Sequence, residues 1–399
     1  MPFDFASAGR IIFGAGRLKE LGGLAAAYGH RALLVTGAQV GRAEAVQQRL
    51  GEARISVCTM SIGQEPTTED LRRGIRLAQA EGRDLVIGFG GGSPMDAAKG
   101  IAALLGNGGD PLDYLEVIGR GSALAKPSLP CIANPTTAGT GTEVTRNAVI
   151  LSPEHGVKVS LRGLHLLPAI ALVDPELSAT MPPAVTASTG LDALTQLIEP
   201  FVSSRANPLT DALCRDGLSR VARSLRRAYE HGEDQPARHD MALAALFSGL
   251  ALGNAGLGSV HGFAGVIGGM VPAPHGALCA ALLPHAIRVN VRAFRERSPD
   301  SQALARFTEL GQLLTGSPSA AAAEAVLWID ELCAALHVPP LGAYGLERWH
   351  LPELLEKSAA ASSMKANPIA LTREEMEEIV LAALGATAGN HGDVVSDAG

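Results

Sequence analysis

The first half of the chain alternates short apolar runs with amphipathic segments. The apolar runs are rich in Val, Ile and Leu, which is typical of buried strands, and the amphipathic segments follow the helical period. Strands and helices in alternation predict an α/β domain with a parallel sheet and crossover helices. The expected strands are 31–36, 55–60, 84–89 and 129–133, and the expected helices are 43–50 and 68–80.

After residue 183 the strand-like runs disappear and helical segments rich in Leu and Ala follow one another, which predicts an all-α second domain. The proline-containing stretch 174–183 is the expected boundary, so the two domains should be 1–182 and 183–399. The tail 386–399 is rich in Gly, Asp and Ser and is expected to fray. The expected helices are 184–202, 208–230, 238–254, 302–314, 318–336, 351–360 and 372–386.

The composition excludes several classes of protein. Of the 399 residues, 47% are hydrophobic and only 18% are charged, which is not the composition of a disordered chain. The 33 basic and 40 acidic residues give a net charge of −7 without a basic block, so nucleic acid is not an expected partner. The stretch 241–287 has no Asp, Glu, Lys or Arg, but its many glycines and prolines favour buried helices over a membrane span.

The cysteines and the N-terminus predict a cytoplasmic protein. The five cysteines form no CxxC pair, and their spacing fits neither a zinc knuckle nor a disulfide framework. The first ten residues include Asp4 and lack the apolar core of a signal peptide. We therefore expect free thiols in a reducing compartment.

A glycine-rich turn, Gly88-Phe-Gly-Gly-Gly-Ser-Pro, follows the third expected strand. Ser93 is a plausible N-cap and Pro94 a plausible first helical residue. Free backbone N–H groups at a helix N-terminus bind anions such as a pyrophosphate. The pattern is neither the Rossmann fingerprint nor a Walker loop, so a tight turn without a ligand is the alternative interpretation.

A second small-residue loop, 134–145, follows the fourth expected strand with the sequence Asn-Pro-Thr-Thr-Ala-Gly-Thr-Gly-Thr-Glu-Val-Thr. Loops after parallel strands meet at the same edge of a sheet, where ligands bind in open α/β folds. This loop and the glycine turn should therefore lie together. The alternative is a threonine-rich loop that only caps a helix.

Four further residues are candidate metal ligands. Asp192 and Gln196 are four residues apart on an expected helix and project from one face. His261 and His275 lie in the charge-free stretch, where histidines are more often hydrogen-bonded core residues than ligands. An Asp oxygen and two His nitrogens would suit Zn²⁺ or Fe²⁺, but the spacing alone does not show that the four converge.

The chain resembles the iron-containing (group III) alcohol dehydrogenase family over nearly its whole length. The matching stretches are 90–99, 135–145, 190–199, and 261 through 275–276 to 283–285. The resemblance implies a dehydroquinate-synthase-like architecture, with a dinucleotide-binding α/β domain, a helical domain and the active site between them. It implies NAD(P)-dependent interconversion of a small alcohol and an aldehyde or ketone, with a divalent metal, in a homodimer or higher homo-oligomer.

The same resemblance implies the residues of the site. Asp192, His261 and His275 would be the catalytic side chains, and together with Gln196 they would hold Fe²⁺ or Zn²⁺. The metal would stabilise the substrate alkoxide while hydride passes between the nicotinamide and the substrate carbon. The cofactor-binding positions would be Gly91, Gly92, Ser93, Asp96, Thr136, Thr137, Thr140, Asn147 and Lys158.

Two positions depart from the family pattern. The family normally has His where this chain has Gln196, and a neutral amide oxygen is a weaker metal ligand. The family's metal-dependent members also commonly have a histidine where this chain has Gly265, so a proton relay there is absent or moved. A metal-independent carbonyl reductase of the maleylacetate-reductase type, or a nucleotide-binding homologue with impaired catalysis, is therefore the alternative function. A sugar-phosphate-converting enzyme on the same scaffold is disfavoured, because stretch 241–287 supplies no Lys or Arg for a phosphate.

One position bears on the choice between NAD and NADP. An acidic residue after the first expected strand would bind the adenosine ribose and repel a 2′-phosphate. This chain has Gly37 there, so a 2′-phosphate is tolerable, with Arg42 near in sequence. We expect NADP to be accepted, with NAD as the alternative.

Overall fold

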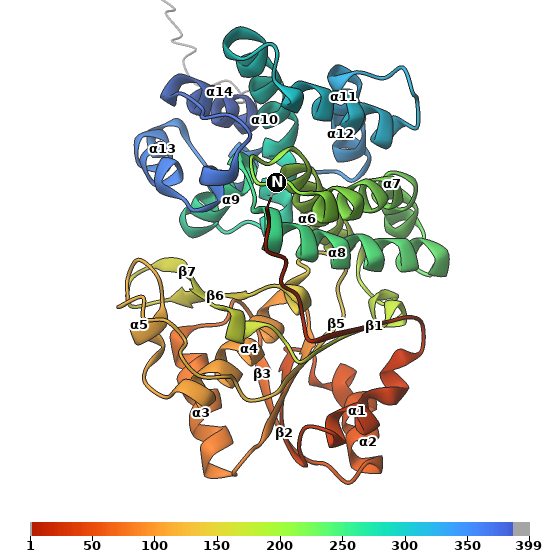
Figure 1. The fold of residues 1–399 in the computed structure, drawn as a ribbon, viewed down its shortest axis with the longest axis vertical. Coiled ribbons are helices and arrows are strands. Elements are labelled where there is room, and N and C mark those ends of the chain that lie inside the picture. Colours follow the sequence, from red (N-terminus) through yellow and green to blue (C-terminus); the bar gives the residue numbers. More distant parts are fainter. Residues whose placement is uncertain (1, 386–399) are drawn as a thin grey trace, which may run out of the picture.

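The computed structural model describes residues 2–385 and consists of an α/β half and a helical half (Figure 1). The α/β half contains a six-stranded, all-parallel sheet in the order β1-β8-β5-β4-β2-β3. This arrangement confirms the predicted fold class. The sheet strands are β1 Arg10–Phe13, β2 Arg31–Gly37, β3 Ser56–Ile62, β4 Leu85–Gly90, β5 Cys131–Pro135 and β8 Ile170–Val173.

Helices cover both faces of the sheet because side chains alternate across each strand. On β2, Leu33 and Val35 pack in the core beneath the helices 68–80 and 92–107, whereas Ala32 and Leu34 pack in the core beneath the helices 21–26 and 44–52. The helices are α1 Leu21–Ala26, α2 Glu44–Glu52, α3 Thr68–Ala80, α4 Gly92–Asn107 and the short α5 Pro111–Tyr114. An antiparallel hairpin, β6 Asn147–Ser152 and β7 Val157–Arg162, adds a second small sheet.

The helical half begins at Pro183, the first residue of α6, where the domain boundary was predicted. The division into domains 1–182 and 183–399 stays a prediction, and the expected fraying of 386–399 lies outside the described residues. The helices are α6 Pro183–Val202, α7 Pro208–Glu230, α8 Gln235–Ala255, α9 Ser259–Met270, α10 His275–Arg297, α11 Gln302–Thr315, α12 Ala322–Ala335, α13 Leu351–Ala360 and α14 Arg373–Leu384.

Most elements expected from the sequence are present, with shifted ends. The largest shift is in α12, which begins at Ala322 instead of residue 318, because residues 318–319 form a turn. Strands β1 and β8 were not predicted, and neither was the hairpin. β1 and β8 are four residues long, which is too short for a clear period in the sequence.

No single helix within residues 2–385 is both long and apolar enough to cross a membrane. In this described part of the chain, one pair of helices, α8 and α9, reaches the required length and composition together, but the pair is bent by 101°.

The two halves meet through backbone contacts around the threonine-rich loop. Gly141 in this loop lies against Gly249 of α8, and a Cβ on Gly249 would overlap the Gly141 carbonyl oxygen. Gly139 lies against α6, where a Cβ would be 2.8 Å from the Thr189 carbonyl oxygen. Glycine permits this approach because it has no side chain. The loop is therefore held by both halves of the molecule.

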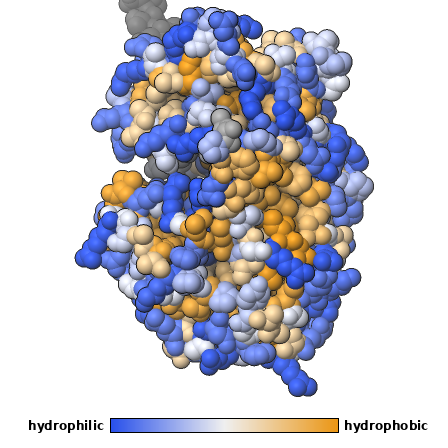
Figure 2. Space-filling view, viewed as in Figure 1, coloured by the Kyte–Doolittle hydropathy of each residue, from blue (hydrophilic) through white to orange (hydrophobic). Residues whose placement is uncertain are grey.

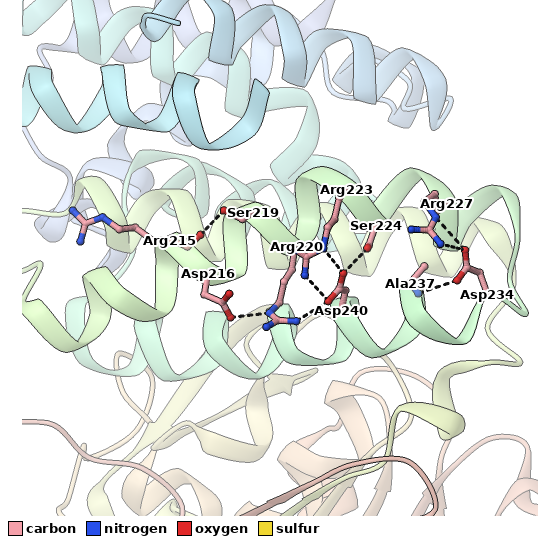
Figure 3. A network of polar contacts seen from close by, with 10 residues as sticks. All are labelled: Arg215, Asp216, Ser219, Arg220, Arg223, Ser224, Arg227, Asp234, Ala237 and Asp240. Atoms are coloured by element: carbon pink, nitrogen blue, oxygen red, sulfur yellow. Dashed lines mark hydrogen bonds and ion pairs between the residues drawn. The ribbon is translucent and has the colours of Figure 1, made fainter. Parts of the chain in front are cut away.

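A polar network fixes α8 to α7 (Figure 3). Asp240 of α8 accepts hydrogen bonds from Arg220 Nη1 (2.6 Å), Arg223 Nε (2.6 Å) and Ser224 Oγ (2.8 Å), all on α7. Burial alone would raise the pKa of Asp240, but Arg223 and Ser224 outweigh this and lower the pKa. The network fixes the helix that carries Gly249.

We expect Asp240→Ala to lower the free energy of unfolding by about 1–3 kcal/mol, because two guanidinium groups and a hydroxyl lose their acceptor. Urea unfolding of the purified protein measures this. Glu230→Ala is the matched control: it removes an exposed i, i+4 partner of Arg226 and should leave the stability nearly unchanged. Equal losses in both variants would show that the network contributes no more than a surface pair.

Candidate active site

The glycine turn joins β4 to α4 and begins the helix earlier than expected. Gly90 has a φ of +151° and packs against Pro94, so a side chain at Gly90 would be strained and would clash. The prediction of Ser93 as N-cap and Pro94 as first helical residue is wrong: Gly91 is the N-cap, and α4 starts at Gly92. The sharp turn at Gly90 directs the chain into the helix two residues sooner. The N–H groups of Gly92 and Ser93 thus belong to the first helical turn, where backbone donors have no intrahelical acceptor.

The turn lies where the strand order of the sheet reverses. β2 has β3 on one side and β4 on the other. The chain continues from β2 to β3 in one direction along the sheet and from β4 to β5 in the other, so the crevice between the ends of β2 and β4 is a topological switch point. Gly37 is the last residue of β2. A Cβ on Gly90 would lie 3.5 Å from the backbone nitrogen of Gly37, so the two strand ends are close together. Arg42 donates through Nη2 to the Leu177 carbonyl (3.1 Å) and the Thr180 hydroxyl (3.0 Å).

The threonine-rich loop adjoins the glycine turn, as predicted. The Thr136 amide donates to the Gly90 carbonyl (2.8 Å). A Cβ on Gly91 would touch Thr137, and one on Gly92 would lie 3.0 Å from Thr140. The structure therefore brings Gly37, Gly91, Gly92, Ser93, Thr136, Thr137 and Thr140 to one edge of the sheet.

Asp96 lies behind this edge in a buried polar network. Its Oδ2 accepts from the Val149 amide (3.0 Å), and its Oδ1 accepts from the Thr142 hydroxyl. The fully buried Lys99 is 3.7 Å from Oδ1 and donates to the Thr142 carbonyl (2.8 Å). Burial raises the pKa of Asp96 and lowers that of Lys99. Both oxygens of Asp96 have partners in the protein, which supports a role in holding the loop to α4; its cofactor role stays a prediction.

Asn147 and Lys158 lie on the β6–β7 hairpin. The Asn147 carbonyl accepts from Lys99, which ties the hairpin to α4. Lys158 forms an ion pair with Glu65 at 2.9 Å, and its side chain is partly exposed. Their assignment to the cofactor ribose stays a prediction.

Asp192, His261 and His275 converge although they come from three helices, α6, α9 and α10. The Asp192 Oδ1 lies 3.3 Å from His261 Nε2 and 3.9 Å from His275 Nε2. The two imidazole centroids are 5.4 Å apart. Asp192 and His261 are buried, whereas the His275 side chain is 44% exposed. The group is thus open on the side of His275.

Cys279 is the fourth member of this cluster, and the sequence analysis did not identify it. It lies one turn after His275 on α10, and one ligand atom from each of the four residues lies within 4.8 Å of the others. Gln196 is placed differently: its Oε1 accepts from Ser248 Oγ at 2.9 Å. The structure therefore brings a thiol, a carboxylate and two imidazoles together, with the amide oxygen of Gln196 already bonded.

Glu199 orients His261 and was also missed. Its Oε2 lies 2.6 Å from His261 Nδ1, and its Oε1 accepts from the Val260 amide (2.7 Å). A hydrogen bond of this kind fixes the orientation of the imidazole ring, with Nε2 facing Asp192 and Cys279. A signal existed in the sequence: Glu199 follows Asp192 by seven residues, and Cys279 follows His275 by four, each on one helical face.

The charges of the cluster reinforce one another. Burial alone would lower the pKa of His261, but the charges of Cys279 and Glu199 raise it well above its usual value. The charge of Cys279 also raises the pKa of His275. Burial would raise the pKa of Cys279, but the two histidines outweigh it and lower the pKa. The same neighbours that raise the pKa values of the two imidazoles would stabilise a cation between them, so this donor set fits a divalent metal.

The cluster adjoins the threonine-rich loop. Ser248 Oγ, which donates to Gln196, lies 3.4 Å from the Gly139 carbonyl oxygen, and Gly139 packs against Thr189, three residues before Asp192. The predicted cofactor loop and the predicted metal residues are thus neighbours. Gly265 on α9 is exposed, and a Cβ there would meet nothing within 4 Å.

Comparison with known proteins identifies the class to which this arrangement belongs. Residues 8–175 match the iron-containing alcohol dehydrogenase family, and residues 186–384 match the C-terminal domain of the Fe-containing alcohol dehydrogenase family. The chain therefore belongs to the iron-containing alcohol dehydrogenase family, which confirms the resemblance seen in the sequence.

Particular relatives support the same conclusion. The chain is 35% identical over 348 residues to alcohol dehydrogenase 4 of Schizosaccharomyces pombe, covering 87% of this chain and 80% of that protein. It is 35% identical over 360 residues to 1,3-propanediol dehydrogenase of Klebsiella pneumoniae, covering 88% and 90%. A crystal structure of 1,3-propanediol oxidoreductase matches with a TM-score of 0.89 and 31% identity, covering 96% of this chain and 100% of that one.

These findings confirm two predictions from the sequence. The chain is an oxidoreductase of the alcohol dehydrogenase type, and it interconverts alcohols and carbonyl compounds with a nicotinamide cofactor. The individual site residues stay predictions.

Proposed function

We propose that this protein is a metal-assisted alcohol dehydrogenase in which Asp192, His261 and His275 hold a divalent cation. The convergence of these three side chains from three helices is the observation that carries the proposal. When bound, the nicotinamide exchanges hydride with the substrate carbon and the cation polarises the substrate oxygen. The donor set argues against the metal-independent reductase and against the impaired homologue.

The chain's own residues position these groups. The N–H groups of Gly92 and Ser93 bind the pyrophosphate at the start of α4, and the threonine-rich loop holds the cofactor toward α6. Glu199 keeps the Nδ1 proton on His261. The substrate enters on the open side of the site, at His275. Gly265 has no side chain that could relay a proton, so the hydroxyl proton of the substrate leaves to solvent on this open side.

The substrate is proposed to be a small, uncharged alcohol or carbonyl compound. Stretch 241–287, which supplies His261, His275 and Cys279, contains no Asp, Glu, Lys or Arg to pair with a charged substrate. The free state of all five cysteines supports a cytoplasmic location.

We expect His261→Ala to lower kcat/KM at least about 100-fold, or about 2.7 kcal/mol in transition-state stabilisation, with little change in cofactor affinity. Initial rates with a panel of short-chain alcohols and aldehydes, beside cofactor titration by fluorescence, measure the two effects. His285→Ala is the control, since His285 lies on the same helix as His275 and contacts Arg288 instead. Unchanged turnover in His261→Ala would remove the metal-centred mechanism.

NADP is proposed to be accepted because Gly37 supplies no carboxylate at the end of β2. Gly37→Asp has space for its side chain, since a Cβ there meets nothing within 4 Å. This variant should lose NADP binding relative to NAD, because the new carboxylate repels a 2′-phosphate. Gly37→Asn is the neutral isostere and should keep NADP binding. Competing titrations of the wild type and both variants measure this, and a wild type that binds NAD alone contradicts the proposal.

A homodimer through the β1 edge of the sheet is the proposed assembly. Among residues 2–385, β1 pairs only with β8, so its outer edge carries backbone groups that no strand of this part of the chain pairs. Ile11 on β1 is 37% exposed and lines an apolar groove, and Figure 2 shows hydrophobic surface across both halves on this view. The groove is formed by Phe5, Ser7, Ile11, Leu209, Ala212, Leu213 and Leu250.

Sedimentation should therefore show a dimer for the wild type and a weakened dimer for Ile11→Lys, because a charge would be buried at the contact. Ser61→Lys on β3, at the opposite edge, should leave the dimer intact. A monomeric wild type, or dissociation caused by Ser61→Lys instead, would contradict assembly through β1.

A further inference from the structure

Cys279 occupies a place that the family pattern does not assign to a metal ligand. Its Sγ lies 3.7 Å from His275 Nε2, 3.8 Å from His261 Nε2 and 3.9 Å from Asp192 Oδ1. The thiol is thus nearly equidistant from the other three ligand atoms. It is fully buried, so it is not placed to attack a substrate as a nucleophile.

These spacings match those of a tetrahedral metal site. Bonds of about 2.0–2.1 Å to nitrogen or oxygen and about 2.3 Å to sulfur, at tetrahedral angles, place ligand atoms about 3.3–3.6 Å apart. The pair His261 Nε2 and Asp192 Oδ1, at 3.3 Å, has this spacing. The pair His275 Nε2 and Asp192 Oδ1, at 3.9 Å, and the three sulfur distances exceed it by up to about half an ångström. A small inward movement of each side chain would bring all four into bonding distance of one ion.

The amide oxygen of Gln196 already has a hydrogen-bond partner. It accepts from Ser248 Oγ (2.9 Å), and Ser248 also donates to the Ala245 carbonyl (2.8 Å) of its own helix. A neutral amide oxygen that is already bonded is a weaker donor for a transition-metal cation than a thiolate sulfur.

We propose that the Cys279 thiolate, and not Gln196, is the fourth protein ligand of the active-site metal. The thiol proton passes to solvent as the sulfur–metal bond forms. Thiolate is a softer donor than the imidazole or amide it replaces, so the site should favour Zn²⁺ over Fe²⁺. This inference rests on the proposed metal-assisted function, and it predicts a ligand set of Asp192, His261, His275 and Cys279.

The test substitutes Co²⁺ into the full-length protein after chelation and dialysis. Thiolate ligation gives a near-ultraviolet sulfur-to-cobalt charge-transfer band, which nitrogen and oxygen ligands do not give. We expect this band in the wild type and in Gln196→Ala, and its loss in Cys279→Ala and Cys279→Ser. Cys333→Ala is the matched control: Cys333 approaches the Ala280 carbonyl, is not in the cluster and should keep the band.

Affinity gives a second readout. Loss of an outer partner of a ligand typically weakens metal binding about 10–100-fold, and loss of Cys279 should weaken Zn²⁺ binding by at least as much. Competition with a chromophoric chelator measures this for Cys279→Ser and Gln196→Ala. A larger loss in Gln196→Ala than in Cys279→Ser would overturn the proposal.

X-ray absorption of the Zn²⁺-loaded wild type needs no variant. It should show one zinc–sulfur distance of about 2.3 Å beside shorter bonds to nitrogen and oxygen. Stoichiometric metal binding without sulfur ligation, or a charge-transfer band that persists in Cys279→Ala, would overturn the role of Cys279 and leave the proposed function standing. A wild type that binds no divalent metal yet turns over alcohol would overturn both.

Discussion

The contact between the threonine-rich loop and helices α6 and α8 determines where the predicted cofactor and metal residues lie. Gly141 meets Gly249, and Gly139 meets Thr189, at distances that leave no room for a Cβ. Backbone packing of this closeness transmits small shifts directly. The loop with the predicted cofactor residues is thereby also packed against the helix that carries Asp192. The Asp240 network affects the loop indirectly. It holds α8 in place, and Gly249 of α8 contacts the loop (Figure 3).

Charge is the second constraint on the site. Asp192, Glu199 and Cys279 are all buried around His261, and buried polar groups are costly unless each has a partner. The two imidazoles are the partners that the helices supply, and a divalent metal would be a stronger one. This chain has Gln196 where the family pattern has a histidine, and it has Cys279 one turn after His275. Cys279 would supply the anionic ligand atom that Gln196 lacks.

Sequence reasoning succeeded where the determining interactions are local. The glycine turn, the strands 31–36 and 84–89 and the long helices follow from residue type and period, and the structure places them within a few residues. It failed at the start of α4, where the turn at Gly90 shifted the N-cap from Ser93 to Gly91. It also missed Glu199 and Cys279. In the sequence they look like any other glutamate or cysteine, and only helix packing places them beside the two histidines.

By itself, the sequence determined the α/β and all-α halves, the two small-residue loops at one sheet edge and the family, because these depend on short-range pattern and ordered motifs. Asp192, His261 and His275 were candidates whose convergence no spacing could establish, since they lie on three helices. Only the tertiary structure decided that they meet, that Gln196 is bonded to Ser248 and that Cys279 lies beside the three other side chains. The physical reason is that the positions and crossing angles of helices depend on side chains from several helices in the core, so they cannot be derived from any one segment of the sequence.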